Sequence, residues 1–271
     1  MRIAIVGGGC IARLILEHIG KGDLGELEVM GLVGREGSAS CRGLAQEHAI
    51  AFTSELDTVI AQRPDAIVEA AAHAWVEAHA EKVLSTGIAL IVLSAGALAD
   101  DMLRQRLEAA ARASGALLYV PSGGIGALDA LKAAVISGAD EVVIRTAKPP
   151  RAWYGIPFVE ALGVELDRLE QPFVLYDGPA RAGVKHFPQN VNIAAVLSMA
   201  GVGFDRTRLV VVADPHVVRN THVITVKAVT GDISITLQNI PSPENPKTAW
   251  LACYSALAAL RQMQSPIRYG T

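Results

Sequence analysis

The chain has 271 residues, of which 51% are hydrophobic and 19% charged, and its formal net charge is −3 at pH 7. At about 100–200 residues per domain, this length suits one large or two moderate domains with a packed core, and the composition excludes a disordered chain. The charge balance, without long runs of Lys or Arg, is not that of a nucleic-acid-binding protein, and no apolar run reaches the roughly 18 residues of a membrane span.

Strands and helices alternate over the first 121 residues. An apolar run that ends in glycines predicts a strand over Arg2–Val6, and apolar residues at helical spacing predict a helix over Ile11–Ile19. The later strands are expected at Glu26–Val33, Ala66–Glu69, Ala89–Leu93 and Ala116–Val120. The later helices are expected at Leu44–Ala49, Thr53–Gln62, Ala74–Ser85 and Asp100–Ser114. This alternation indicates βαβ crossovers and a doubly wound, mainly parallel sheet.

Pro121 ends the alternation, and several strands follow one another in the second half. The strands are expected at Glu141–Ala147, Phe173–Tyr176, Leu209–Ala213, Val223–Val229 and Ile233–Gln238. Gly231-Asp232 predicts a tight hairpin between the last two, and the succession favours an antiparallel sheet. The helices are expected at Ala127–Ser137, Ile193–Ala200 and Pro246–Met263, the last with Asn245 as its N-cap.

Residues 7–12, Gly-Gly-Gly-Cys-Ile-Ala, match the pattern G-x-G-x-x-G/A between a predicted strand and a predicted helix. In this pattern Gly7 permits a tight turn, Gly9 lets the backbone approach a pyrophosphate, and Ala12 lets the helix pack closely on the strand. The start of the helix offers N–H groups and partial positive charge to phosphates. The loop therefore predicts a dinucleotide cofactor, and the alternative is a glycine-rich turn without a ligand. The expected cofactor contacts are Gly7, Gly9, Cys10, Ile11 and Ala12.

The end of the second predicted strand bears on the choice between NAD and NADP. NAD sites commonly have Asp or Glu there to bind the ribose 2′-hydroxyl, whereas Val33 is followed by Gly34 and Arg35. A guanidinium can bind a 2′-phosphate with two parallel hydrogen bonds. We therefore expect Arg35 to contact the cofactor and NADP to be accepted, with or without NAD. The neighbouring Glu36 complicates this interpretation, and the alternative is that Arg35 is a solvated loop residue.

These patterns predict an α/β protein with a doubly wound, Rossmann-type nucleotide domain and a second, α+β catalytic domain. The nucleotide domain is expected to span 1–121 and to be completed by the C-terminal helix segment 241–271. The catalytic domain is expected to span 122–240, with the active site in the cleft between the two.

Further motifs give the sequence a family resemblance over nearly its whole length. They are the segments 93–98 (LSAGAL), 120–130 (VPSGGIGALDA), 146–150 (TAKPP), 187–192 (FPQNVN), 214–215 (DP) and 220–222 (NTH). Together with the loop at residue 7, they resemble the L-aspartate dehydrogenase family. Two positions depart from the family's pattern: Gly124, where Ala is common, and Arg35, where some members have an acidic residue.

This resemblance implies an enzyme that reversibly oxidises L-aspartate with NAD(P)+ to iminoaspartate, which hydrolyses to oxaloacetate and ammonia. It also implies a homodimer, assembled through the second domain, and a link to NAD biosynthesis. Two alternatives remain open. One is another two-domain NAD(P)-dependent reductase, similar to homoserine dehydrogenase or dihydrodipicolinate reductase. The other is an NADP(H)-sensing protein without catalytic activity.

The resemblance also implies roles for particular residues. His222 matches the catalytic histidine, and a free imidazole, with a pKa of about 6.5, can accept or donate a proton near neutral pH. Gly124 and Asn190 match cofactor contacts. Because aspartate has two carboxylates, Asn192 and Lys148 are candidates for binding them, and Lys185 and His186 are further cationic candidates that the spacing does not rank. The alternatives are a structural histidine, an interdomain glycine turn, asparagines that cap a helix, and a lysine in a loop.

The three cysteines, Cys10, Cys41 and Cys253, lack the spacing of a zinc site or a disulfide framework and fit a reducing compartment. We therefore expect a cytoplasmic oxidoreductase that acts on small molecules, without a bound metal and without a nucleic-acid or membrane partner.

Overall fold

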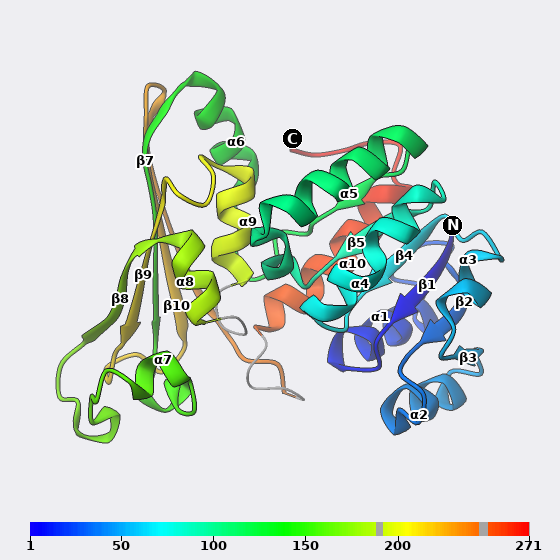
Figure 1. The fold of residues 1–271 in the computed structure, drawn as a ribbon, viewed down its shortest axis with the longest axis horizontal. Coiled ribbons are helices and arrows are strands. Elements are labelled where there is room, and N and C mark those ends of the chain that lie inside the picture. The colour runs from blue at the N-terminus through cyan, green and yellow to red at the C-terminus, as the bar shows by residue number, and fades with distance from the viewer. Residues whose placement is uncertain (188–191, 244–248, 271) are drawn as a thin grey trace. The chain divides into compact units, whose positions relative to one another are not determined.

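The computed structural model describes residues 1–187, 192–243 and 249–270 (Figure 1). It consists of two compact units. The first comprises Met1–Pro121 with Cys253–Arg268, and the second comprises Ser122–Ala252 with the chain's last residues from Tyr269 onward. Among the described residues, no helix is both long enough and apolar enough to span a membrane.

The first unit contains a six-stranded parallel sheet with the strand order β3-β2-β1-β4-β5-β6. Its strands are β1 (Arg2–Val6), β2 (Glu28–Val33), β3 (Phe52–Thr53), β4 (Ala66–Glu69), β5 (Ala89–Val92) and β6 (Leu118–Tyr119). The doubly wound, Rossmann-like prediction is thereby confirmed. The strand order reverses between β1 and β4, and the carboxyl ends of the strands at such a switch point are where this fold binds ligands.

The helices of the first unit are α1 (Cys10–Gly20), α2 (Ala39–Glu47), α3 (Leu56–Ile60), α4 (His73–Ser85), η1 (Ala95–Ala99), α5 (Asp101–Ser114) and most of α10 (Trp250–Gln264). Two differ from the prediction for local reasons. α2 begins before Leu44 because the Ser38 hydroxyl caps it by accepting from Cys41 N at 3.4 Å. α3 begins after Thr53 because Thr53 pairs with Val33 in the short strand β3, which was not predicted.

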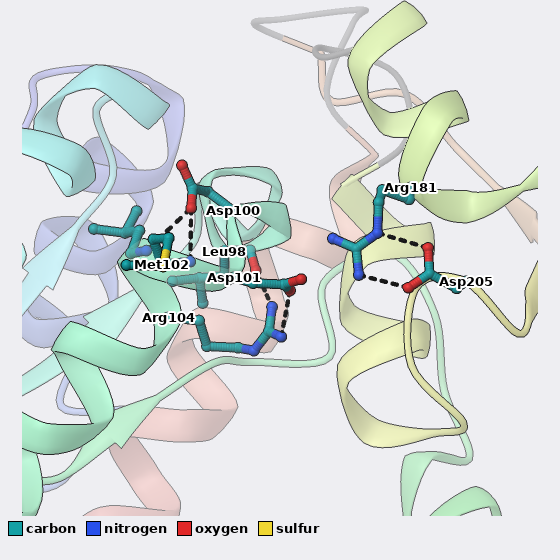
Figure 2. A network of polar contacts seen from close by, with 8 residues as sticks. Leu98, Asp100, Asp101, Met102, Arg104, Arg181 and Asp205 are labelled. Atoms are coloured by element: carbon teal, nitrogen blue, oxygen red, sulfur yellow. Dashed lines mark hydrogen bonds and ion pairs between the residues drawn. The ribbon is translucent and has the colours of Figure 1, made fainter.

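The start of α5 is capped by a side chain, and side-chain contacts attach α10 to this unit. Asp100 caps α5 by accepting from Met102 N and Leu103 N at 2.8 and 3.1 Å (Figure 2). Buried Leu257 and Leu260 of α10 belong to the same apolar core as β1 and α1. Gln264 Nε2 also donates to Leu24 O at 2.7 Å, so the C-terminal helix completes the first unit.

The segment 241–252, which the sequence analysis assigned to the first domain, belongs to the second unit. Pro241 and Ala249 form an antiparallel bridge, and Trp250 N donates to Ile240 O at 2.9 Å, so both ends of this stretch stay near the last strand of the second sheet. Asn245 and Pro246, the expected start of the C-terminal helix, lie outside the described residues, and α10 is described from Trp250.

The second unit contains a five-stranded sheet with the order β11-β10-β7-β9-β8. Its strands are β7 (Ala139–Lys148), β8 (Phe173–Pro179), β9 (Thr207–Ala213), β10 (Asn220–Ala228) and β11 (Gly231–Asn239). The prediction of an antiparallel sheet is wrong for one pair, because β7 and β9 are parallel. The chain between them is long enough for the crossover that parallel strands require.

The hairpin between β10 and β11 turns two residues earlier than predicted. Ala228 pairs with Gly231, so the turn consists of Val229 and Thr230, while Gly231 and Asp232 already belong to β11. Gly231 has φ +127°, a conformation that L side chains rarely adopt, and this explains a glycine at the first position of the returning strand.

Helices α6 (Leu128–Ser137), α8 (Ala180–His186) and α9 (Asn192–Ala200) lie on one face of this sheet (Figure 1). Three short helical turns, η2 (Pro150–Trp153), α7 (Pro157–Glu160) and η3 (Leu166–Arg168), follow β7. Neither they nor α8 were predicted. The start of α8 is tied to the chain ahead of β9 because Arg181 Nε and Nη2 donate to the two oxygens of Asp205 at 2.6 and 2.8 Å (Figure 2).

Candidate functional site

The loop between β1 and α1 has the backbone that the glycine pattern predicts. Gly7 has φ +100°, and a Cβ on it would lie 2.4 Å from Ala70 O, so only glycine fits. A Cβ on Gly8 would lie 2.7 Å from three atoms of Cys41. By contrast, a Cβ on Gly9 would have no atom within 4 Å, so the described chain leaves this side of the loop open.

The start of α1 suits an anionic group. Gly9 is the N-cap and no side chain caps the helix, and its first turn has no acidic residue. The first N–H groups of an α-helix have no partner inside the helix and carry partial positive charge. Cys10 and Ile11 are partly exposed, whereas Ala12 is fully buried, as close packing of helix on strand requires. A pyrophosphate therefore fits here.

Arg35 follows β2 and is exposed, with its carbonyl accepting from Ser38 N at 3.0 Å. The Ser38 hydroxyl caps α2, so the loop from Arg35 leads directly into a helix N-terminus. Arg42, on the first turns of α2, holds its guanidinium carbon 4.8 Å from the Phe52 ring centroid. Two cationic side chains and a helix start thus belong to the same short stretch after β2.

His222 lies on β10 with its side chain on the helix-covered face of the second sheet, and it is 3% exposed. It pairs with Thr146 of β7, and His222 Nδ1 and Thr146 Oγ1 are hydrogen-bonded at 3.1 Å. Burial lowers the pKa of His222 to about 3, and the positive charge of Lys148 contributes to the decrease. The imidazole is therefore uncharged at neutral pH, and Thr146 fixes its orientation.

Lys148 is the last residue of β7, two positions beyond Thr146 and on the same face of the strand. It is only 5% exposed, and its ammonium lies 5.0 Å from the centroid of the buried Trp153 ring. Burial lowers the pKa of Lys148 to about 8, so it remains mostly protonated at pH 7. The alternative interpretation of Lys148 as a loop residue is wrong, because it belongs to the strand and its side chain is buried.

Gly124 lies at the same end of this sheet. Its carbonyl accepts from Asn239 Nδ2 at 2.7 Å, and Asn239 pairs with Asn220, two residues before His222. A Cβ on Gly124 would lie 3.5 Å from Ile193 Cγ2, so the start of α9 is nearby as well. Asn192 is the first residue of α9. Asn190, the other expected cofactor contact, lies outside the described residues.

The structure thus groups the expected residues into two sets, one in each unit. The first set is the loop from Gly7 to Ala12 together with Arg35, at the carboxyl ends of β1 and β2. The second set is His222, Lys148 and Gly124. Within the described ranges, no cluster of His, Cys, Asp and Glu could hold a metal ion.

Two residues of this site were not predicted from the sequence: Thr146, which contacts His222, and Trp153, which contacts Lys148. The signal for Thr146 was present. In the strand ending at Lys148, the alternate residues Val142, Ile144, Thr146 and Lys148 share a face that is buried throughout. A polar residue at such a position needs a partner. Trp153, in an unpredicted turn after two prolines, gave no comparable signal.

Two family models match the chain. One, described as "Aspartate dehydrogenase, C-terminal", matches residues 129–263, and the other, "Homoserine dehydrogenase, NAD binding domain", matches residues 7–121. The chain is 38% identical over 280 residues to L-aspartate dehydrogenase of Methanosarcina acetivorans, with 100% of both chains covered. It is 45% identical over 215 residues to L-aspartate dehydrogenase 2 of Bordetella pertussis, with 79% of each covered.

Among solved structures, an aspartate dehydrogenase from Thermotoga maritima is similar over the whole chain. It has a TM-score of 0.77 and 27% sequence identity, with 100% of this chain and 99% of that chain covered. The similarity therefore extends through both units.

Proposed function

Because the chain belongs to the aspartate dehydrogenase family, we propose that it reversibly oxidises L-aspartate with NAD(P)+ to iminoaspartate, which hydrolyses to oxaloacetate and ammonia. The observation that carries this proposal is the pair formed by the uncharged His222 and the cationic Lys148, buried on one face of the second sheet. A proton acceptor beside a cation suits a substrate with two carboxylates and an amine. The homoserine dehydrogenase model describes a nucleotide-binding domain and matches only the first unit, so it does not favour homoserine as the substrate.

His222 acts, in this proposal, on protons rather than on the hydride. Its Nδ1 is hydrogen-bonded to Thr146, so Nε2 is the nitrogen that exchanges a proton with the reacting molecules. It accepts a proton from the water that attacks C2 of iminoaspartate and returns it as ammonia leaves. The substrate's two negative charges oppose the effects of burial and of Lys148, and so favour the imidazolium while substrate is bound.

Lys148 binds a substrate carboxylate, because a buried ammonium is stabilised by an opposite charge close to it. Asn192, at the start of α9, is a second candidate for a carboxylate contact. Gly124 and Asn190 are proposed to contact the nicotinamide end of the cofactor, as the family resemblance implies.

The loop residues Gly7, Gly9, Cys10, Ile11 and Ala12 are proposed to hold the pyrophosphate at the start of α1. When bound, NAD(P)+ accepts the hydride from C2 of L-aspartate. Arg35 is proposed to bind the 2′-phosphate of NADP, with the start of α2 close by in the chain.

A homodimer is proposed to form through the face of the second sheet opposite the helices. Helices α6, α8 and α9 cover only the other face. The uncovered face carries apolar side chains that are half-buried in the single chain, namely Val143, Val210 and Val223. We further propose a cytoplasmic enzyme whose product iminoaspartate supplies NAD biosynthesis, because the family resemblance implies that role and the three cysteines lack the spacing of a disulfide framework.

The reaction is tested by absorbance at 340 nm with L-aspartate and NAD+ or NADP+, against homoserine as the rival substrate. We expect aspartate-dependent reduction, and we expect His222→Ala to lower kcat at least about 100-fold while the Kd for NADPH stays within about threefold. Near-wild-type turnover by His222→Ala would remove the histidine from the mechanism. Cofactor binding without turnover of L-aspartate or homoserine would favour the cofactor-sensing protein instead.

The role of Lys148 predicts a pH-dependent affinity for dicarboxylates. The Ki of succinate, measured against L-aspartate, should rise up to about tenfold per pH unit above pH 8, because Lys148 loses its charge with a pKa of about 8 while both succinate carboxylates stay ionised. Lys148→Met should raise the Ki at pH 7 and abolish the pH dependence. Lys185→Met, on the exposed side of α8, is the matched control, and the role would pass to Lys185 if that variant gave the flat profile instead.

Arg35→Ala should raise KM for NADP+ at least about tenfold more than KM for NAD+, because only NADP+ carries the 2′-phosphate. The control is Arg112→Ala, an exposed residue of α5 that forms an ion pair with Glu108. Equal changes in KM for the two cofactors would contradict the proposed phosphate contact.

The dimer is tested by light scattering. We expect a mass of twice 28.5 kDa for the wild-type chain and a shift toward the single-chain mass for Val143→Lys, because the substitution places a charge on the proposed contact face. A single-chain mass for the wild type at micromolar concentration would overturn the proposed dimer.

A further inference from the structure

Glu69 is a fully buried carboxylate at the end of β4, and the reaction proposed above does not use it. Its Oε1 accepts from Ala71 N at 2.8 Å and from the Ser94 hydroxyl at 2.7 Å. Its Oε2 accepts from Leu93 N at 3.1 Å and from Ser94 N at 2.9 Å. All four partners are donors, so the side chain serves only as an acceptor, which suits a carboxylate and not its amide analogue.

These donors come from two different loops. Ala71 lies in the loop that follows β4, whereas Leu93 and Ser94 lie in the loop that follows β5. One side chain therefore connects the carboxyl ends of two neighbouring strands. Each of its hydrogen bonds is charge-assisted and shielded from water, and such bonds are stronger than those between neutral groups.

The loop after β4 also supports the glycine loop at residue 7. The carbonyl of Ala70 and the Cα of Ala71 lie 2.4 and 3.3 Å from where a Cβ on Gly7 would be, so the two loops are in close backbone contact. By fixing Ala71, Glu69 also fixes the surface against which Gly7 turns. The carboxylate thus contacts the loops that follow β4 and β5 directly, and the loop that follows β1 contacts it indirectly, through the loop after β4.

These loops lie at the switch point of the sheet, between β1 and β4, where a doubly wound fold binds its ligand outside the carboxyl ends of the strands. We propose that Glu69 is a positioning residue for the dinucleotide. Without touching the cofactor, its carboxylate holds the loops after β4 and β5 in the arrangement that binds it. This inference rests on the proposed use of NAD(P) by the first unit.

A preformed site binds more tightly because less ordering is needed on binding. We therefore expect Glu69→Gln to raise the Kd for NADPH, measured by its fluorescence, at least about tenfold. The substituted amide has the size of the carboxylate, but its NH2 group would face N–H donors at one of the two oxygen positions. At saturating cofactor, KM for L-aspartate should stay within about threefold of the wild-type value, because the substrate residues are proposed in the second unit.

Ser94→Ala removes one of the four donors and leaves Glu69 in place, so it should give a smaller rise in Kd for NADPH. This variant carries the test if Glu69→Gln does not fold. Hydrogen exchange gives a second readout, because the amides of Ala71, Leu93 and Ser94 should exchange faster in Glu69→Gln than in the wild type. A substitution that only weakened the fold would not concentrate faster exchange at these three positions.

Val83→Ala is the control for a general loss of stability. Val83 is fully buried on α4 in the same unit, so the cavity should lower the melting temperature and leave the Kd for NADPH unchanged. A Kd in Glu69→Gln and Ser94→Ala equal to that of the wild type would overturn the positioning role. Failure of the wild-type chain to bind either dinucleotide would instead overturn the proposed cofactor, so the two results are distinguishable.

Discussion

The hydrogen bond between His222 Nδ1 and Thr146 Oγ1 is the contact on which the proposed chemistry depends. It lies between two paired strands on the buried face of the second sheet, so the imidazole cannot turn away without losing its partner. Burial and the neighbouring Lys148 both disfavour the imidazolium. Without substrate, the site therefore holds a neutral proton acceptor beside a cation. A bound dicarboxylate would stabilise the positive charge of Lys148 and favour the protonated form of His222.

Each unit contains a buried ionisable side chain at the end of a strand. Glu69 ends the otherwise apolar strand β4, and Lys148 ends β7 on the buried face of that strand. Burying a charge is costly unless partners compensate, so each of these side chains needs partners close to it. For Glu69 the partners are the amides of two loops and the Ser94 hydroxyl, whereas for Lys148 they include the Trp153 ring and, in our proposal, the substrate.

Much of the first unit follows from the sequence, because parallel strands buried on both faces are nearly continuous apolar runs and glycines mark the loop at residue 7. The second unit was harder to predict. The apolar residues of β7 and β9 identify strands but not their direction, so their parallel pairing was missed. The turn consists of Val229 and Thr230, which are not residues typical of tight turns. The turn was therefore predicted two residues later, at the glycine Gly231. Partners distant in sequence, such as Thr146 for His222 or Leu93 for Glu69, depend on the tertiary fold.

The most direct test of the account is an NMR titration of the His222 imidazole, assigned by comparison with His222→Gln. In the free enzyme the ring should show no titration between pH 5 and pH 8, because burial lowers its pKa to about 3. Addition of succinate with bound cofactor should raise that pKa, because two carboxylates then face the ring. A free-enzyme His222 that titrates near pH 6.5, with no response to succinate, would contradict the buried, uncharged proton acceptor on which the proposed mechanism rests.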